Sequence, residues 1–345
     1  MNTEQNSSEV EELDLTQDNI VINGEVVDPD DPDQNLQGTA EPARLPKTYV
    51  LHHDDNDGWF GGAIAIGTLF DPTIEIIAKA VQYGQDFPVA MDDLKNEDSV
   101  YIIDFSYSRE ILDEVHKRVQ TLVVLDHHET AESQLKGAPY AIYDLTKSGA
   151  LLAWEYFVPQ YPPSPVCEIV NAWDLWNKNH PDYNWDIVRA FYLGTREFKG
   201  NYDFWNAMAA SYSFPKECIE AGNALLEQFF VTVNDVKNDT RTVIEEINGK
   251  RVCFFRCASD VSLLSDALYS DPELNLDITA AVMLKDDQWV TSLRTPKPHE
   301  IHVGNIAKKL GGGGHKAAAG FRVHKKDIDE TDAIAYIAGL LKTAV

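Results

Sequence analysis

Three stretches of sequence decide the fold: TYVLHH at 48–53, SVYIIDFS at 99–106 and TLVVLDHH at 121–128. Each is a short run of β-branched and aromatic residues that ends in acids or histidines. An amphipathic segment, SREILDEVHKRVQ at 108–120, lies between the last two runs. Strands that alternate with helices predict an α/β fold, with a parallel sheet covered by helices on both faces.

The rest of the chain predicts two further regions. Residues 148–235 are mostly helical in pattern, and the polar stretch VKNDTRT at 236–242 marks a boundary. Beyond it, strand-like runs flank Asn248-Gly249, a strong hairpin signal, and helices and strands follow in a smaller α/β unit. We therefore predict a first domain at 47–235, a linker at 236–243 and a second domain at 244–345.

Charge is unevenly distributed along the chain. The formal net charge is -27, from 29 basic and 56 acidic residues, which argues against bulk attraction to long nucleic acids or anionic membranes. Residues 1–46 hold 12 acids and one base, so we predict a disordered acidic tail, in which residues 18–27 could form a hairpin. Residues 294–326 instead hold eight bases and one acid, which favours an anionic ligand there.

Hydropathy and cysteine content argue against a membrane-spanning, secreted or disulfide-rich protein. No apolar run is long enough to cross a bilayer, and the N-terminus lacks a signal-peptide pattern. The four cysteines do not have the spacing of a zinc site or a disulfide scaffold, and Cys253 and Cys257 are read as core residues. We expect a cytoplasmic protein with no membrane partner, and a homodimer is compatible with the sequence.

The polar ends of the three strands predict a metal site. In a parallel sheet the carboxyl ends of neighbouring strands meet at one edge, which would bring HHDDNDG at 52–58, Asp104 and the acid and histidines at 126–128 together. Converging carboxylates repel one another unless cations neutralise them, and mixed Asp/His ligation suits Mn²⁺, Mg²⁺ or Zn²⁺. Taken singly, each motif also has an ordinary reading as a turn or a helix cap.

These motifs together resemble the DHH phosphoesterase superfamily, which is named after its Asp-His-His motif. Asp174 in NAWDLW resembles the family's fourth motif, although WDLW can also be read as an aromatic helix face. GGGGHKAAAGF at 311–321 resembles the GGGH signature of the DHH-associated substrate-binding domain. The resemblance covers about 48–345 and implies an active site in the cleft between a larger catalytic and a smaller substrate-binding domain.

The resemblance also implies roles for individual residues. It implies two divalent cations, Mn²⁺ or alternatively Mg²⁺, with Asp104 bridging them, and His128 facing the phosphate while Asp126 orients the histidines. The first histidine ligand is His53 or, as the alternative, His52. The implied metal ligands are His53, Asp55, Asp57, Asp104, His127 and Asp174, and the implied substrate-binding residues are Arg294, Gly312, Gly313, Gly314 and His315.

A short substrate agrees best with this sequence. The resemblance implies hydrolysis of phosphoester bonds, by metal-hydroxide attack, in short oligonucleotides or small nucleotides, as in the nanoRNase-like branch. The alternatives are a catalytically silent nucleotide- or single-strand-binding relative, and an exonuclease on longer single strands. The acidic charge and the lack of a further domain after residue 345 argue against the exonuclease. Ser148 is read as a helix cap, and Trp173, Trp176, Trp185, Tyr192 and Trp205 as helix packing, with base stacking as the alternative.

Overall fold

The computed structural model describes residues 20–22, 25–27, 44–82, 85–296, 300–314, 316–328 and 332–345. Residues 1–45 and 46–345 form two separate units. In the first unit, β1 (Ile20–Ile22) and β2 (Glu25–Val27) pair antiparallel, as the hairpin pattern predicts. Of the predicted acidic tail, residues 1–19, 23–24 and 28–43 lie outside the described residues.

The N-terminal sheet of the second unit is parallel throughout, as predicted. Its order is β4-β3-β5-β6-β7. The strands are β3 (Lys47–His53), β4 (Glu75–Val81), β5 (Ser99–Ile103), β6 (Thr121–Asp126) and β7 (Ala141–Tyr143). Because β3, β5 and β6 are neighbours in this order, the motifs that follow them emerge side by side at one edge of the sheet.

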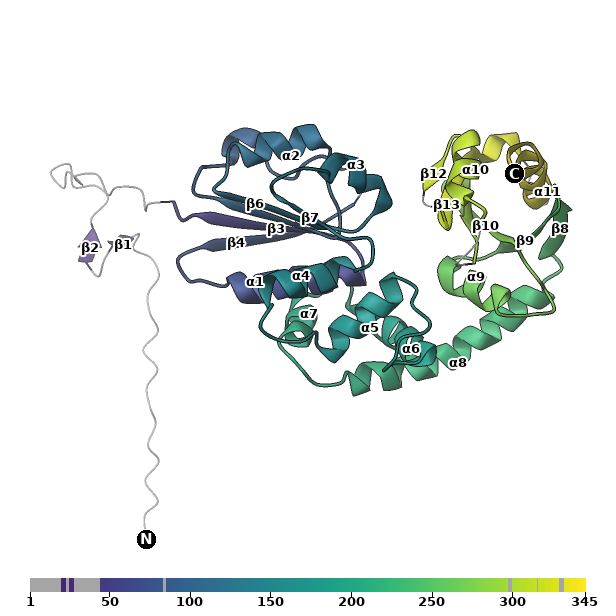
Figure 1. Ribbon diagram of the computed structural model, residues 1–345, viewed down its shortest axis with the longest axis horizontal. Helices are drawn as coiled ribbons and strands as arrows, with labels where there is room; N and C mark the ends of the chain where they lie inside the picture. The colour runs from purple at the N-terminus through teal and green to yellow at the C-terminus, as the bar shows by residue number, and fades with distance from the viewer. Residues whose placement is uncertain are drawn as a thin grey trace, which may run out of the picture. The chain divides into compact units, whose positions relative to one another are not determined.

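Helices cover both faces of this sheet (Figure 1). On one face lie α1 (Asn56–Leu69) and α4 (Gly149–Phe157), and on the other α2 (Arg109–His116) and α3 (Glu132–Leu135). The strands alternate accordingly, with Val50 in the core on the α1 side and Leu51 in the core on the α2 side. Such strands are buried on both sides, which explains their nearly continuous apolar sequence.

A group of helices follows the N-terminal sheet. It comprises α5 (Pro165–Asp174), α6 (Trp185–Thr195), α7 (Tyr202–Ala209) and α8 (Lys216–Asn238). Ser148 and Ser164 cap α4 and α5 by accepting from backbone N–H groups in the first turn, so the reading of Ser148 as a cap is confirmed. The linker predicted at 236–243 begins inside α8, because the helix continues to Asn238 despite its polar end.

The C-terminal sheet is mixed, with the order β12-β13-β11-β10-β9-β8. It consists of β8 (Val243–Ile247), β9 (Lys250–Arg256), β10 (Ile278–Lys285), β11 (Gln288–Arg294), β12 (Gly313–Gly314) and β13 (Ala318–His324). Its helices are α9 (Val261–Tyr269), α10 (Val303–Lys309) and α11 (Ala333–Ala344). Asn248 and Gly249 have φ of 51° and 75°, so the predicted hairpin turn is present.

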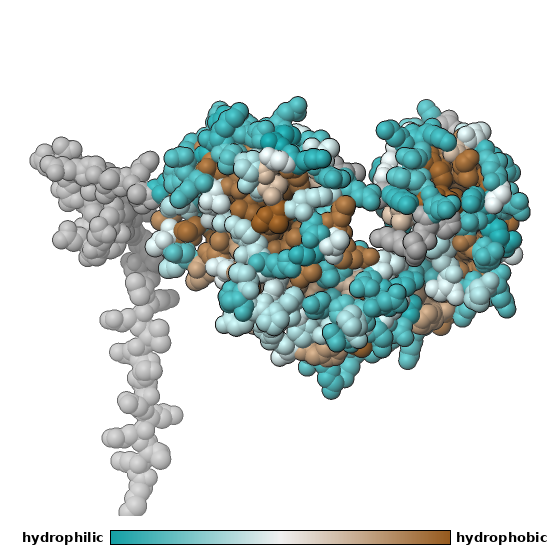
Figure 2. Space-filling model, viewed as in Figure 1, coloured by the Kyte–Doolittle hydropathy of each residue, from teal (hydrophilic) through white to brown (hydrophobic). Residues whose placement is uncertain are grey.

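Figure 2 shows the distribution of polar and apolar residues on one face of the molecule. Brown, apolar residues on the visible face lie mostly between teal, polar ones. Among the described residues no helix is both long enough and apolar enough to pass through a lipid bilayer. The division into domains at 47–235 and 244–345 stays a prediction, although the two sheets lie on either side of that boundary.

Candidate metal centre

All six predicted metal ligands lie together beyond the ends of β3, β5 and β6. Their potential ligand atoms form groups within 4.8 Å of one another: His53 with Asp55 and Asp104, and Asp57 with His127 and Asp174. A further group joins Asp104 to His127 and His128. Asp104 therefore belongs to the surroundings of both His53 and His127, the arrangement that a bridging carboxylate requires.

The distances within the cluster are short. His53 Nδ1 lies 2.8 Å from Asp55 Oδ2 and 3.6 Å from Asp104 Oδ2. On the other side, His127 Nε2 lies 3.1 Å from Asp104 Oδ1 and 3.3 Å from Asp174 Oδ2. Each imidazole is thus close to two carboxylates, and small adjustments would let the same atoms surround a cation.

Local backbone structure holds the carboxylates in place. Asp55 caps α1 by accepting from the Gly58 N–H at 3.0 Å. Asp57, which is 3% exposed, accepts from the first residues of α4, Gly149 N–H at 2.6 Å and Ala150 N–H at 3.0 Å. The partial positive charge of a helix N-terminus stabilises a carboxylate there. Asp57 therefore joins the first turn of α4 to this cluster, and its role as a metal ligand stays a prediction.

Asp104 has a strained backbone and an unusual electrostatic environment. Its φ is 65°, in the left-handed region that few non-glycine residues adopt. Its Oδ2 atom is buried and has no hydrogen-bond partner among the described residues. Burial, together with the nearby carboxylates of Asp57 and Asp55, raises the pKa of Asp104 well above its usual range. A divalent cation would neutralise this repulsion, so the residues present fit such an ion.

The same carboxylates change the pKa of His53. Burial by itself would lower the pKa of His53, but the carboxylates of Asp104 and Asp55 outweigh burial and raise it to about 10. A proton on His53 would offset part of the negative charge of these carboxylates. Because a metal ligand must be deprotonated, metal binding here would release that proton.

The structure separates the two candidate histidines at the end of β3. His52 is fully buried, with Nε2 2.8 Å from the Tyr202 hydroxyl and Nδ1 2.8 Å from the His53 carbonyl. Burial lowers the pKa of His52 to about 4. Its ring packs edge-on against Trp59, with the ring centroids 4.6 Å apart. His52 is therefore occupied in the core, and the geometry favours His53 as the candidate ligand.

Asp126 lies behind the two histidines that follow it. It is fully buried, and its Oδ1 accepts from the backbone N–H groups of His127 at 2.7 Å and His128 at 3.1 Å. The same oxygen lies 2.8 Å from His128 Nδ1. Such contacts fix the orientation of an imidazole ring, as expected for a residue that supports the site from behind.

Of the predicted substrate-binding residues, Arg294 lies close to this cluster. A cavity of about 720 Å³ is lined by Asp55, Asp174 and Arg294 together. The Arg294 side chain, at the end of β11, donates from Nη1 to the Leu293 carbonyl at 2.9 Å and from Nε to Ser262 Oγ at 3.3 Å. These contacts hold the guanidinium at the cavity wall, where it can meet an anion.

Among the described residues, the glycines of the GGGH signature, unlike Arg294, do not line this cavity. Gly313 and Gly314 form β12 and pair with β13, and residues 312–314 are absent from the described lining of the 720 Å³ cavity, which includes Ala317 and Ala318. A Cβ on Gly312 would lie 2.0 Å from the Gly320 carbonyl oxygen, so close strand packing explains this glycine. His315 lies outside the described residues.

Aromatic residues also line the cavity. The sequence assigns them to helix packing, with base stacking as the alternative. Trp173, Trp176 and Tyr192 line the cavity, and the rings of Trp173 and Tyr192 stack with centroids 3.8 Å apart. Trp205, by contrast, is fully buried and purely structural. Only the folded chain shows that α5, α6 and the residues between them place these rings in the same cavity as Asp174.

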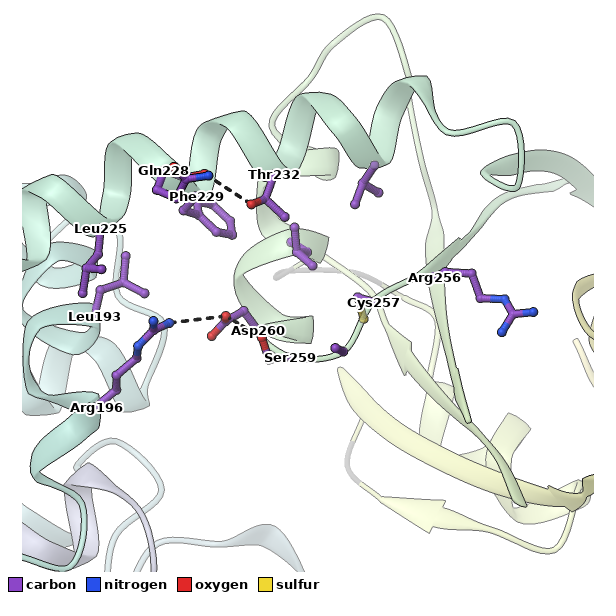
Figure 3. Close-up of a pocket in the computed structure, with 13 residues that line it drawn as sticks. Leu193, Arg196, Leu225, Gln228, Phe229, Thr232, Arg256, Cys257, Ser259 and Asp260 are labelled. Carbon is purple, nitrogen blue, oxygen red and sulfur yellow. Dashed lines mark hydrogen bonds and ion pairs between the residues drawn. The ribbon is translucent and has the colours of Figure 1, made fainter. Parts of the chain in front are cut away.

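A second cavity, of about 340 Å³, lies between α6, α8 and the segment after β9 (Figure 3). Arg196 and Asp260 form an ion pair across it at 3.7 Å. Cys257 lies in its wall, where it is half-buried and packs against a core cluster that includes Phe255 and Leu264, so its reading as a core residue agrees with its packing although β9 ends at Arg256. Cys253 is buried in the core as expected.

Comparison with known proteins agrees with the motifs. The DHHA1 domain model matches residues 265–342. A protein of Acanthamoeba polyphaga mimivirus, R106, described as uncharacterized, is 28% identical over 286 residues, which cover 79% of this chain. The match spans 66% of that relative's length, slightly less than two thirds.

Solved structures share the fold at low sequence identity. The pGpG-specific phosphodiesterase PggH of Vibrio cholerae matches with a TM-score of 0.53 and 14% identity, over 87% of this chain and all of that one. An exopolyphosphatase-related protein of Bacteroides fragilis matches with a TM-score of 0.55 and 14% identity, over 86% and 92% of the two chains.

The exonuclease RecJ of Thermus thermophilus, solved with Mn²⁺, matches with a TM-score of 0.51 and 14% identity, over 86% of this chain and 52% of that one. The family model accounts for the C-terminal part, and the three structures share the α/β architecture that carries the clustered motifs. The motifs of this chain thus resemble those of the DHH phosphoesterase superfamily, its C-terminal part matches the DHHA1 domain model, and its fold is similar to that of these three structures.

Proposed function

We propose that this protein is a metal-dependent phosphoesterase that hydrolyses short oligonucleotides or small nucleotides. The observation that carries the proposal is the cavity of about 720 Å³ that joins Asp55 and Asp174 of the metal centre to Arg294. Its volume lies in the range of small-molecule sites, roughly 300–1,000 Å³. A ligand in it would contact carboxylates suited to cations at one end and a guanidinium suited to phosphate at the other.

The chemistry divides between the proposed metal ligands and their neighbours. Two divalent cations, most simply Mn²⁺ or Mg²⁺, would activate a water molecule and polarise a phosphoryl oxygen. Asp104 would be their common ligand because it lies beside both His53 and His127. His128, held by Asp126, would donate a hydrogen bond to the reacting phosphate or the leaving oxygen. Arg294 would bind a second phosphate of the substrate.

Charge favours a short substrate, and the cysteines favour a reducing compartment. The net charge of -27 repels a long polyanion, whereas the basic residues of 294–326 would attract a small anion locally. All four cysteines are unpaired, as suits a cytoplasmic protein. The clustering of all six proposed ligands argues against a catalytically silent relative, because loss of activity normally removes ligands.

A substrate panel with Mn²⁺ tests the proposal. It comprises 3′-phosphoadenosine 5′-phosphate, linear and cyclic dinucleotides, and 5- and 20-nucleotide RNA and DNA. We expect a linear dinucleotide or the 5-mer to give the highest kcat/KM. Preference for the 20-mer would favour an exonuclease on long strands, and binding without turnover of any substrate would favour a nucleotide-binding relative.

A further inference from the structure

Asp266, on α9, is a buried carboxylate with three donors from another part of the chain. It is 5% exposed. The indole N–H groups of Trp176 and Trp185 donate to its Oδ1 and Oδ2 atoms, each at 3.2 Å, and the Lys178 ammonium donates to Oδ1. A buried charge is tolerated when it is paired and hydrogen-bonded, as it is here.

The donors belong to the segment that directly follows Asp174. Trp176 and Lys178 lie between α5 and α6, and Trp185 is the first residue of α6. Trp176 has a φ of 57°, a left-handed conformation that is costly for a tryptophan. The contact with Asp266 helps to hold this conformation, so Asp266 fixes the chain two residues beyond a proposed metal ligand.

The same face of the helix also contacts Arg294. Ser262 accepts from Arg294 Nε at 3.3 Å, and the Tyr269 hydroxyl donates to the Arg294 carbonyl. One rigid helix, α9, therefore carries the contacts to Arg294 and, through Asp266, the contact to the Asp174 segment. Asp174, Asp266 and Arg294 all line the 720 Å³ cavity.

Another polar link between α9 and the helices before it is weaker. Asp260 precedes α9 and pairs with Arg196 at 3.7 Å, with side chains 21% and 43% exposed (Figure 3). Exposed ion pairs of this kind contribute little to stability. Asp266, with three donors and little exposure, is the contact that can hold the two walls of the cavity at a fixed separation.

We propose that Asp266 is a positioning residue for catalysis, which sets the spacing between the metal centre and Arg294 and so decides how a nucleotide substrate fits. The inference rests on the proposed function. The effect of Asp266 therefore differs between substrates. Binding of a substrate that must contact both Asp174 and Arg294 depends on Asp266, whereas binding of a small phosphodiester that contacts only the metal centre does not.

The experiment compares Asp266→Asn with Asp271→Asn. Asp271 follows α9 and pairs with Lys237 of α8, so its variant also removes an ion pair at this helix but lies outside the cavity lining. For Asp266→Asn we expect KM for a linear dinucleotide to rise about tenfold, because an amide replaces a charged acceptor, while Mn²⁺ binding and turnover of bis(4-nitrophenyl) phosphate stay within about twofold. Asp271→Asn should change neither.

Two further measurements test whether Asp266 holds the segment that follows Asp174. Amide hydrogen exchange over residues 175–184 should accelerate in Asp266→Asn, whether or not the protein turns over a substrate. If that variant does not fold, Trp185→Phe, which removes one donor and keeps an aromatic side chain, should give a smaller KM rise with the same selectivity. An equal loss on both substrates, or an unchanged KM for the dinucleotide, would overturn the inference. Failure of the wild type on every phosphoester would instead refute the proposed function.

Discussion

At the residue scale, two adjacent histidines on β3 have opposite surroundings. His52 hydrogen-bonds Tyr202 in the core, whereas His53 faces Asp55 and Asp104. The sequence left this choice open, because side-chain alternation along a strand separates neighbours but does not tell which one turns toward the site. The left-handed backbone of Asp104 also leaves no mark in the sequence.

Replacing each histidine by glutamine should give opposite effects. His53→Gln should weaken Mn²⁺ binding by at least about tenfold, because it removes a proposed ligand and leaves the core intact. His52→Gln should keep Mn²⁺ binding but lower the free energy of unfolding by about 1–2 kcal/mol, through loss of a buried hydrogen bond. Calorimetric Mn²⁺ titration and urea unfolding measure the two quantities. The reverse pattern would assign the ligand to His52.

At the element scale, strand identity could be predicted well and helix ends less well. The apolar runs that end in Asp104 and Asp126 became β5 and β6, since strands buried on both faces read as continuous apolar segments. Strand β13 was missed because its sequence begins Ala-Ala-Gly, residues that favour strands weakly. Helix α8 runs to Asn238 through a polar end because its partly exposed surface tolerates polar residues.

The start of α4 offers a test at this scale. A Cβ on Gly149 would lie 2.4 Å from the Asp104 Cβ and 2.8 Å from its Cα. Gly149→Ala should therefore destabilise the protein by about 1–3 kcal/mol and weaken Mn²⁺ binding, because the helix must move away from Asp104.

The matched control is Gly67→Ala in α1, where nothing lies within 4 Å of the added methyl group. That change should stabilise the protein by up to about 1 kcal/mol, since alanine favours a helix over glycine. Thermal and urea unfolding of both variants, with Mn²⁺ titration, provide the comparison. Equal behaviour of the two variants would show that close contact at Gly149 is unimportant.

At the scale of the whole molecule, the sequence and its resemblance predicted two sheets, a basic window and an active-site cleft, but not the aromatic residues that line the cavity. Asp55, Asp174 and Arg294 are far apart in the chain, and the packing of α9 beside the α5–α6 segment brings them into the lining of one cavity. The glycines at 312–314 were predicted to bind substrate, a role that stays a prediction, and their close strand contacts have a structural reason of their own.

The acidic N-terminal region gives a further prediction at this scale. We expect removal of residues 1–44 to leave the melting temperature and dinucleotide hydrolysis unchanged, because residues 1–46 hold 12 acids and one base and few residues that could join a core. Differential scanning calorimetry and steady-state kinetics on the shortened and full chains check this. A large fall in melting temperature would show that the region packs on the body.

Hydrolysis of a linear dinucleotide, measured before and after removal of metal from the wild type and from Asp104→Asn, tests whether these carboxylates hold catalytic cations. The wild type should lose activity in chelator and regain it with Mn²⁺, while Asp104→Asn, which lacks the proposed shared ligand, should bind fewer ions and stay inactive. Asp287→Asn, at a residue whose side chain is 76% exposed, serves as the control and should behave as the wild type. Turnover that survives chelation, or Asp104→Asn with normal activity and metal content, would contradict the account.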